Sequence, residues 1–257
     1  MTKEDIITIL KPYLEKLIDV VAAWEGGSKA TNTDDMYSDL DLMIVTHNNS
    51  KEQVYKLVVD YLDTTFGIER HHRVKEPAWH GFSQGFFKLK NTPEYFYIDV
   101  AIMTKDTDDK FISEKRHGKA KIWFDKENVL NTSPLSNEAI KQKIASMYKR
   151  ATDIDFLFII ETKKQLYRKN FSEAFTAMYR FLQSSASVIF NIEHRPNQVD
   201  FGLRYAYRAY SKRDFEIIET CLKANTISTL DSAFKSLLKR YEVLKDNHAV
   251  HVQSVNK

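Results

Sequence analysis

The chain has 257 residues, of which 43% are hydrophobic and 28% are charged, and its formal net charge is +3. This length allows one large domain or two modest ones, with the composition of an ordinary globular protein. No stretch approaches the roughly eighteen consecutive apolar residues of a membrane span, and the small net charge predicts no strong attraction to nucleic acid. The single cysteine, Cys221, excludes an internal disulfide, suits a reducing cytoplasm, where we expect the protein, and is expected to fill helix core.

The character of the sequence changes near residue 134. Before that point lie most of the glycines and all three tryptophans, among short apolar runs bounded by turn residues. After it, nearly the whole sequence has helical periodicity. We therefore predict an α+β domain at residues 1–133, with a mixed sheet and helices on one face, followed by an all-α helical bundle at residues 134–257, joined near 131–134.

The elements follow in chain order. In the first domain we expect, in sequence, a helix at 3–18, strands at 20–24 and 38–46, a helix at 51–64, a hairpin of strands at 85–90 and 95–103, a short helix at 108–115 and a strand at 120–124. In the second we expect helices at 137–167, 172–191, 203–210, 215–224 and 230–244. Ser136 is the expected N-cap of the first of these, and Ser172 or Asn170 that of the second.

Three aspartates fall in the strand-like runs. In TDDMYSDLDLMIV, strand alternation places Asp39 and Asp41 on one side and Leu40 and Leu42 on the other. In YFYIDVAIM, Asp99 lies opposite the apolar face. If the two strands are neighbours, three carboxylates meet on one surface and raise each other's pKa values. A hard divalent cation relieves this repulsion, and an oxygen-only set suits Mg²⁺.

A Gly-Gly-Ser turn precedes the acidic strand. Glycines allow backbone N–H groups to approach a ligand closely, and the hydroxyl of Ser28 adds a donor. Such a turn fits a triphosphate lying between the loop and a metal ion. The chemistry indicated is an in-line displacement at phosphorus.

These residues resemble a known superfamily. Gly27 and Ser28, Asp39 eleven positions after Ser28, Asp41, and a third aspartate on a later strand are similar to the motif of DNA-polymerase-β-type nucleotidyltransferases. The segment at 33–45 resembles the corresponding part of antibiotic adenylyltransferases of the kanamycin nucleotidyltransferase kind. HGKAKIWFDK, at 117–126, resembles a strand that follows the third acid in many members. The resemblance covers residues 20–126; beyond them only helical character is shared.

The resemblance implies particular roles. Asp39, Asp41 and Asp99 would hold Mg²⁺ and take part in catalysis, while Gly27 and Ser28 would contact the nucleotide phosphates. Two positions depart from the pattern. Lys29 stands where many members have arginine, and is a further candidate for the phosphates, and Asn32 stands in place of a second glycine. Because asparagine tolerates left-handed backbone, the turn can survive.

The sequence leaves other roles open. A general base is needed; Asp99 could serve, and the helix at 137–167 offers Asp153, Asp155 and Glu161, of which we name Asp155. Any of these three helix residues is also consistent with an ordinary surface charge. Likewise Asp39 and Asp41 could form a solvated strand face, with Asp99 an unrelated edge residue. RPNQVDFGLRY, at 195–205, could line a cleft or could be a turn in which an Asp–Arg pair fixes the next helix.

We therefore expect a Mg²⁺-dependent enzyme that transfers AMP from ATP to a hydroxyl group of a small molecule and releases pyrophosphate. By resemblance the acceptor could be an aminoglycoside-like antibiotic, although the slight positive charge of the chain argues mildly against a polycationic acceptor. One alternative keeps the chemistry but modifies protein or RNA, as in transferases paired with toxins. A second is a nucleotide-binding module without turnover. Whether the chain forms a homodimer is left open.

Overall fold

The computed structural model describes residues 1–78, 80–131 and 136–253. The chain divides into two compact units, Met1–Pro134 and Leu135–Lys257. This division lies one residue beyond the predicted boundary, and the linker expected at 131–134 falls, from residue 132 on, outside the described residues. Within the described ranges, no helix has both the length and the apolar character that crossing a bilayer requires.

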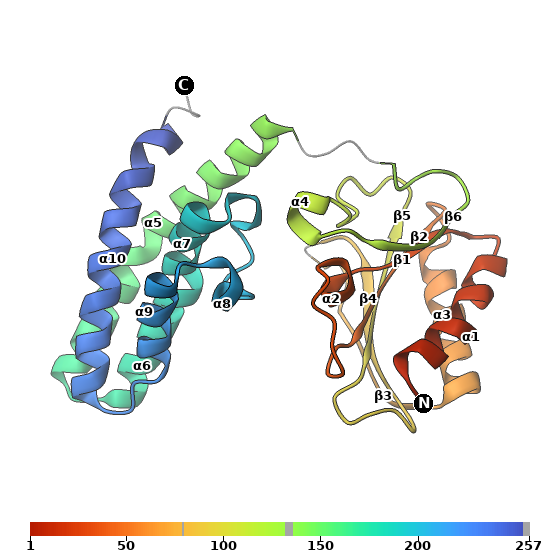
Figure 1. Cartoon of the computed structure of the whole chain (residues 1–257), viewed down its shortest axis with the longest axis horizontal. Helices are drawn as coiled ribbons and strands as arrows, with labels where there is room; N and C mark the ends of the chain where they lie inside the picture. Colours follow the sequence, from red (N-terminus) through yellow and green to blue (C-terminus); the bar gives the residue numbers. More distant parts are fainter. Residues whose placement is uncertain (79, 132–135, 254–257) are drawn as a thin grey trace. The chain divides into compact units, whose positions relative to one another are not determined.

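The N-terminal unit is built around one mixed sheet (Figure 1). Its elements in chain order are α1 (Lys3–Lys16), β1 (Val20–Glu25), α2 (Gly27–Ala30), β2 (Leu40–Thr46), α3 (Lys51–Phe66), β3 (Ile68–Arg73), β4 (Ser83–Leu89), β5 (Ile98–Thr104), α4 (Glu114–His117) and β6 (Lys121–Asp125). The six strands have the order β3-β4-β5-β2-β1-β6. Only β2 and β5 pair in parallel; β1–β2, β1–β6, β3–β4 and β4–β5 are antiparallel. The predicted α+β class and the hairpin, now β4 and β5, are confirmed.

The alternation in the two acidic strands sorts their side chains as predicted. Leu40, Leu42 and Ile44 of β2 and Ile98, Val100 and Ile102 of β5 are buried in the core beneath α1 and α3. These long helices lie on one side of the sheet, and the short α2 and α4 lie on the other (Figure 1). On that second face a smaller core contains Trp24, Val45, Ala101 and Met103. The acidic side chains of β2 and β5 therefore belong to the face that the long helices leave uncovered.

Several predicted elements of this unit need correction. The strand expected from residue 38 begins at Leu40, so Asp39 precedes it, and the strand expected from residue 95 begins at Ile98. The short helix expected at 108–115 is instead Glu114–His117. The edge strand β3, with sequence IERHHR, was not predicted, because an exposed edge strand shows no apolar alternation.

The helical unit contains α5 (Asn137–Tyr167), α6 (Phe171–Phe181), a π-helical turn (Leu182–Ala186), α7 (Ser187–His194), a 3₁₀ turn (Pro196–Gln198), α8 (Ala206–Ala209), α9 (Lys212–Leu222) and α10 (Ile227–Gln253). The bounds of α5 agree with the prediction. Ser136 caps it by accepting from the backbone N–H of Ala139 at 3.1 Å, and Asn170, not Ser172, is the N-cap of α6. Cys221 is fully buried, as expected, and burial raises its pKa to about 12.

Two predicted helices of this unit are different in the structure. The helix expected at 172–191 extends through Phe171–His194 but is interrupted by the π-helical turn. The helix expected at 203–210 is reduced to Ala206–Ala209, because Gly202 and Tyr205 have positive φ angles of 58° and 59°. Left-handed residues cannot continue a right-handed helix.

Candidate functional site

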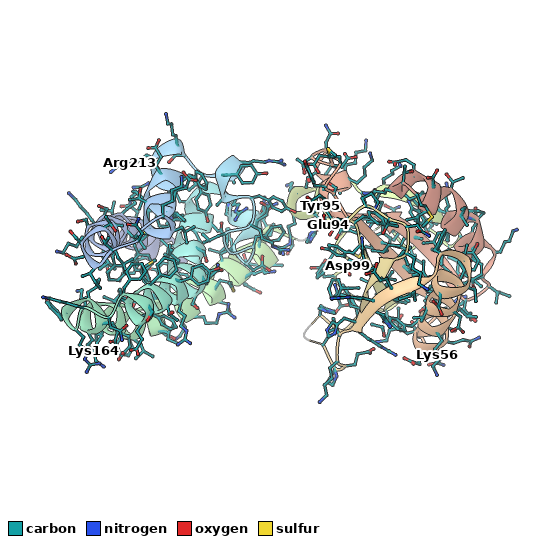
Figure 2. All side chains as sticks on the ribbon, turned by 90° about the horizontal axis from the view of Figure 1, so that it is seen from below. Lys56, Glu94, Tyr95, Asp99, Lys164 and Arg213 are labelled. Atoms are coloured by element: carbon teal, nitrogen blue, oxygen red, sulfur yellow. The ribbon has the colours of Figure 1, made fainter. Side chains whose placement is uncertain are left out.

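The parallel pairing of β2 and β5 brings the acids together. Asp41 and Asp99 are direct partners in the register of these strands, and Asp39 comes immediately before β2. The conditional prediction that the two strands are neighbours is therefore confirmed. Figure 2 labels Asp99 on the sheet, well apart from Lys56 of α3 in the same unit.

The electrostatics of the pair are those of carboxylates that repel each other. Burial, together with the charges of Asp39 and Asp99, raises the pKa of Asp41 to about 7. Burial also raises the pKa of Asp99 to about 6; hydrogen bonds from Gln84 act against this rise, and the charge of Asp39 adds to it. Burial, followed by hydrogen bonding to Asp39, raises the pKa of Tyr97. The charge of Lys3 acts to lower the pKa of Asp41 but does not offset the rise, so the protein's own cations leave the acids only partly compensated.

Gln84 is a site residue that the sequence did not reveal. It lies on β4, and its side-chain N–H₂ group donates to both oxygens of Asp99, at 2.8 and 2.9 Å. The contact depends on the register of β4 and β5, in which Gln84 is opposite Ala101. Alternation within SQGFF indicates only the face of Gln84, so no sequence signal identifies its partner.

Lys3 contacts the backbone just before β2. Nζ of Lys3 donates to the backbone carbonyl of Asp39 at 2.7 Å. The same group lies 2.8 Å from Oε1 of Glu25, which is 1% exposed, in a close ion pair without hydrogen-bond geometry. Lys3 thus links Glu25 to the backbone at Asp39, and its charge acts to lower the pKa of Asp41.

The Gly26–Gly27 turn lies directly against Asp41. The backbone N–H of Gly26 donates to the carbonyl of Asp41 at 2.9 Å, and Gly27 has φ +54°. A Cβ added to Gly27 would lie 1.6 Å from Oδ2 of Asp41, so only glycine fits here. The expected turn is followed at once by the short helix α2, whose first N–H groups lack partners within the helix.

The hydroxyl of Ser28 is available to a ligand. Its Oγ is buried, and no hydrogen-bond partner for it is found among the described residues. Buried side-chain hydroxyls usually have a hydrogen-bond partner, so such a group calls for an explanation. Asn32, at φ +54°, adopts the left-handed conformation that the sequence required of it. Lys29 instead pairs with Asp34, its Nζ 2.7 Å from Oδ2.

Gly118 holds α2 in place from the other side. It has φ +82°, and an added Cβ would lie 2.4 Å from the carbonyl oxygen of Ala30. The next residue, Lys119, donates its backbone N–H to that oxygen at 2.8 Å. The segment HGKAK thus closes on the turn that carries Ser28.

The carboxylates do not form a ready metal site as they stand. Within the described part of the chain, no group of three or more His, Cys, Asp or Glu side chains is arranged as metal ligands. The roles of Asp39, Asp41 and Asp99 as ligands stay a prediction. The residues nevertheless fit a hard cation, because the donors are all oxygen and because burial, together with the neighbouring carboxylates, raises the pKa values of Asp41 and Asp99.

Asp155, the proposed general base, is occupied within the helical unit. It is 6% exposed, and its Oδ2 accepts from the hydroxyl of Tyr241 at 2.8 Å and from Nζ of Lys245 at 3.2 Å. Buried and paired in this way, it has the surroundings of a group that stabilises the bundle. Its catalytic role stays a prediction, as does that of Asp99, the other candidate base.

Comparison with known proteins gives a fold-level result. No family model matches the chain, and no curated protein matches it in sequence. Among solved structures, the chain is similar to an aminoglycoside 6-adenyltransferase from Bacillus subtilis, with 9% identity, a TM-score of 0.37, and coverage of 100% of this chain and 99% of that one. It is similar to a nucleotidyltransferase-like protein from Exiguobacterium sibiricum, with 10% identity, a TM-score of 0.40, and coverage of 98% and 77%.

A third similar structure is a STING-associated c-di-GMP synthase, CdnE, from Capnocytophaga granulosa, with 14% identity, a TM-score of 0.33, and coverage of 98% of this chain and 80% of that one. All three likenesses have TM-scores below 0.5 and carry no argument about the family of this chain. At such identities and TM-scores the likeness decides neither activity nor substrate, which depend on the site itself.

Proposed function

We propose that the chain is a Mg²⁺-dependent nucleotidyltransferase that transfers AMP from ATP to a hydroxyl group. The observation that carries the proposal is the direct pairing of Asp41 with Asp99, beneath a turn in which Gly27 leaves no room for a Cβ. Three acids gathered on one surface, with pKa values raised for two of them, are suited to a cation.

The residues can be given roles. Asp39, Asp41 and Asp99 would hold the metal ion, which when bound would supply charge neutralisation at the transferring phosphate. The N–H groups at the start of α2 and the hydroxyl of Ser28 would contact the triphosphate. Asp99, whose pKa is raised to about 6, would take the proton of the acceptor hydroxyl.

In this reaction the acceptor oxygen forms a bond to the α-phosphorus of ATP. The bond from that phosphorus to the oxygen bridging to the β-phosphate breaks, and pyrophosphate leaves with its electron pair. The chain's own contribution is to position the phosphates and to accept the proton. The acceptor is a small molecule in this proposal, and an aminoglycoside-like antibiotic is the class that the sequence resemblance suggests.

The test measures pyrophosphate release from ATP and Mg²⁺ with a panel of hydroxyl acceptors that includes aminoglycosides. We expect Asp41→Asn to lower the rate by about 10³-fold or more, as loss of a group that stabilises charge in the transition state does. The control is Asp153→Asn, which removes an exposed acid paired with Lys149 on α5. Equal rates in the wild type and Asp41→Asn would refute the proposal.

The acceptor class is tested with ATP labelled in its α-phosphate and an extract of cells. Label recovered in small molecules is the expected result. Label recovered in protein or RNA would replace the small-molecule acceptor with a macromolecular one while leaving the proposed chemistry in place.

A further inference from the structure

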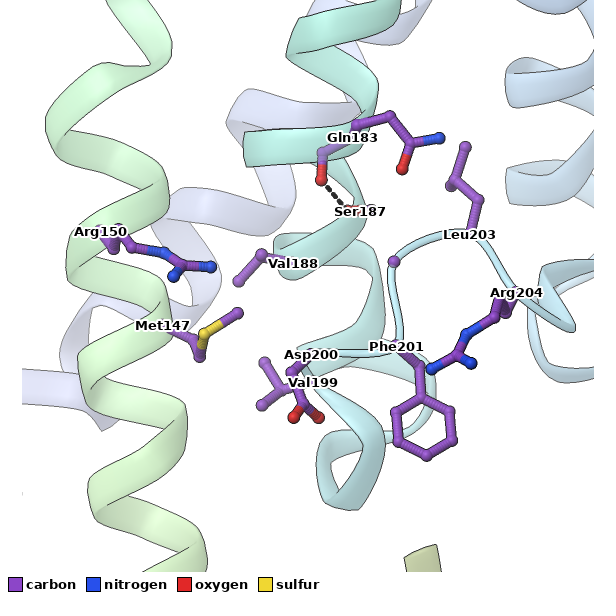
Figure 3. A pocket seen from close by; sticks show the side chains of 11 residues that line it. Met147, Arg150, Gln183, Ser187, Val188, Val199, Asp200, Phe201, Leu203 and Arg204 are labelled. Atoms are coloured by element: carbon purple, nitrogen blue, oxygen red, sulfur yellow. Dashed lines mark hydrogen bonds between the residues drawn. The ribbon is translucent and has the colours of Figure 1, made fainter. Parts of the chain in front are cut away.

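The helical unit contains a cavity of its own, of about 600 Å³. Its walls come from α5, from the π-helical turn with the start of α7, and from the segment after the 3₁₀ turn (Figure 3). This volume lies within the range of small-molecule sites, about 300–1,000 Å³. The segment at 195–205, which the sequence left open between a cleft lining and a structural turn, lines this cavity with its residues 199–204.

The lining combines an apolar surface with positive charge. Met147, Val188 and Val199 supply the apolar part, and Arg150 and Arg204 contribute two guanidinium groups. The guanidinium of Arg150 extends from α5 toward the cavity (Figure 3). The guanidinium of Arg204 lies over the ring of Phe201, 5.1 Å from its centroid.

One carboxylate lines the cavity, and it is compensated from outside. Oδ2 of Asp200 lies 2.7 Å from Nζ of Lys143, which is not among the lining residues. Two arginines thus line the cavity against one carboxylate, and that carboxylate is paired with Lys143. A site of this charge favours an anion, and guanidinium groups match the geometry of phosphate and carboxylate.

A buried network holds the lining segment in place. Arg195 is 7% exposed, and it donates from Nε to Oδ1 of Asn191 at 2.6 Å and from Nη2 to the carbonyl of Gly202 at 2.8 Å. The amide of Asn191 donates to the carbonyls of Val199 and Gly202, at 3.3 and 3.0 Å. A buried cation used to fix a surface loop makes the cavity rigid before any ligand binds, which lowers the entropy lost on binding.

The π-helical turn forms the facing wall. Oγ of Ser185, in this turn, donates to the carbonyl of Ala151 at 2.9 Å, which ties the wall to α5 next to Arg150. Oγ of Ser187 donates to the carbonyl of Gln183 at 2.9 Å, as drawn in Figure 3. Single π-helical turns are rare and occur often at functional sites, because they interrupt the regular helix ladder.

From the cavity, its two guanidinium groups and the buried network beneath its loop, we infer that the helical unit binds a small organic anion. Its ligand carries a phosphate or carboxylate group held by Arg150 and Arg204 and an apolar part against Met147, Val188 and Val199. The inference does not depend on the proposed transferase activity, since it concerns residues of the helical unit alone.

The experiment titrates the full chain with phenyl phosphate, phenylacetate and the neutral benzyl alcohol, and follows the side-chain Nε–H resonances of arginine by NMR. We expect saturable shifts at Arg150 and Arg204 with at least one anion and none with benzyl alcohol. Phenyl phosphate and phenylacetate distinguish the two possible anionic groups. No saturable shift with either anion, or equal shifts with the neutral probe, would overturn the inference.

Variants give a second measurement. Arg150→Gln and Arg204→Gln should each weaken binding by about tenfold, the effect of losing one charge-assisted hydrogen bond. The matched control is Arg208→Gln, an exposed arginine near the lining segment that lies over the ring of Tyr207 and is not part of the lining. Asp200→Asn should strengthen binding, because it removes the lining carboxylate. Equal weakening by Arg208→Gln would assign the binding to general surface charge and refute the site.

Discussion

Asp214 of the helical unit and the pair Asp41 and Asp99 of the N-terminal unit have pKa values shifted in opposite directions. In the helical unit, the fully buried Asp214 accepts from Nε and Nη2 of Arg240, at 2.7 and 2.8 Å, and has Nε2 of His194 at 2.8 Å. Burial acts to raise its pKa, but the hydrogen bonds from Arg240 and His194 outweigh burial and hold the pKa below its ordinary value. Asp155 is paired similarly, with Tyr241 and Lys245.

In the N-terminal unit the pKa values of Asp41 and Asp99 are raised instead, first by burial and then by neighbouring carboxylates, that of Asp39 among them. A buried acid that has a cation from its own unit stabilises the fold. A group of acids raised in pKa by burial and by one another destabilises the fold, and is retained where a ligand compensates it. The direction of the pKa shift therefore separates acids that stabilise the fold from candidate functional acids. Substitution of each kind tests this distinction.

The largest effect is expected at Asp214. Asp214→Asn would leave the partly buried Arg240 and His194 without the charge of the fully buried Asp214. Breaking a buried ion pair typically lowers the free energy of unfolding by about 3–5 kcal/mol. Denaturant unfolding of the variant and the wild type measures this loss. Asp153→Asn is the control, since its exposed pair with Lys149 contributes about 1 kcal/mol at most. If Asp214→Asn lowered the free energy of unfolding no more than Asp153→Asn does, the view that Asp214 stabilises the fold would be wrong.

Gly27→Ala should come next, at about 2–4 kcal/mol, because it adds both left-handed strain and a clash with Asp41. Gly81→Ala separates the two causes. Gly81 has φ +78°, but nothing lies within 4 Å of its added Cβ, so strain alone acts there and a loss of about 1–2 kcal/mol is expected. Equal losses of unfolding free energy in the two variants would show that a Cβ at position 27 does not clash with Asp41.

Asp41→Asn should stabilise the chain without divalent ions. Because folding raises the pKa of Asp41 to about 7 from 3.8, its protonation favours the folded state, and this stability is lost as the pH rises through 7. At pH 8 the variant should exceed the wild type by about 1–3 kcal/mol, and near pH 4 the difference should vanish.

Adding Mg²⁺ gives a second test of the stability difference between the wild type and Asp41→Asn. At pH 8 it should stabilise the wild type against denaturant and have little effect on the variant, because a divalent ion compensates the repulsion only where the carboxylates are present. A wild type that is more stable than Asp41→Asn at pH 8 without Mg²⁺ would contradict the account of the acidic site.

The smallest effect is expected at Ser28. Ser28→Ala should change the free energy of unfolding by less than about 1 kcal/mol, because it removes a buried hydroxyl for which the described residues offer no partner. It should instead raise the KM for ATP about 2–10-fold, the range for one hydrogen bond. Ser185→Ala is the contrasting variant: it removes the bond to the carbonyl of Ala151 and should lower stability by about 1 kcal/mol without affecting KM.

The sequence by itself determined the class of the fold and the faces of the acidic strands. Alternation in LDLMIV and in YFYIDVAIM separated the aspartates from the apolar side chains, because the period of a strand is fixed by its backbone. The period of a helix likewise located α5 to the residue. Asn32 indicated its own left-handed conformation, since few other side chains tolerate it.

Tertiary structure decided which residues meet. The opposition of Asp41 and Asp99, the bonds from Gln84 to Asp99, and the closing of HGKAK on α2 all depend on register and on contacts between distant segments. The same holds for Asp155, whose sequence position suggested an available base and whose partners, Tyr241 and Lys245, lie far along the chain. Local sequence sets the direction of a side chain, whereas its partner, and with it the pKa and the role of a buried acid, is set by packing.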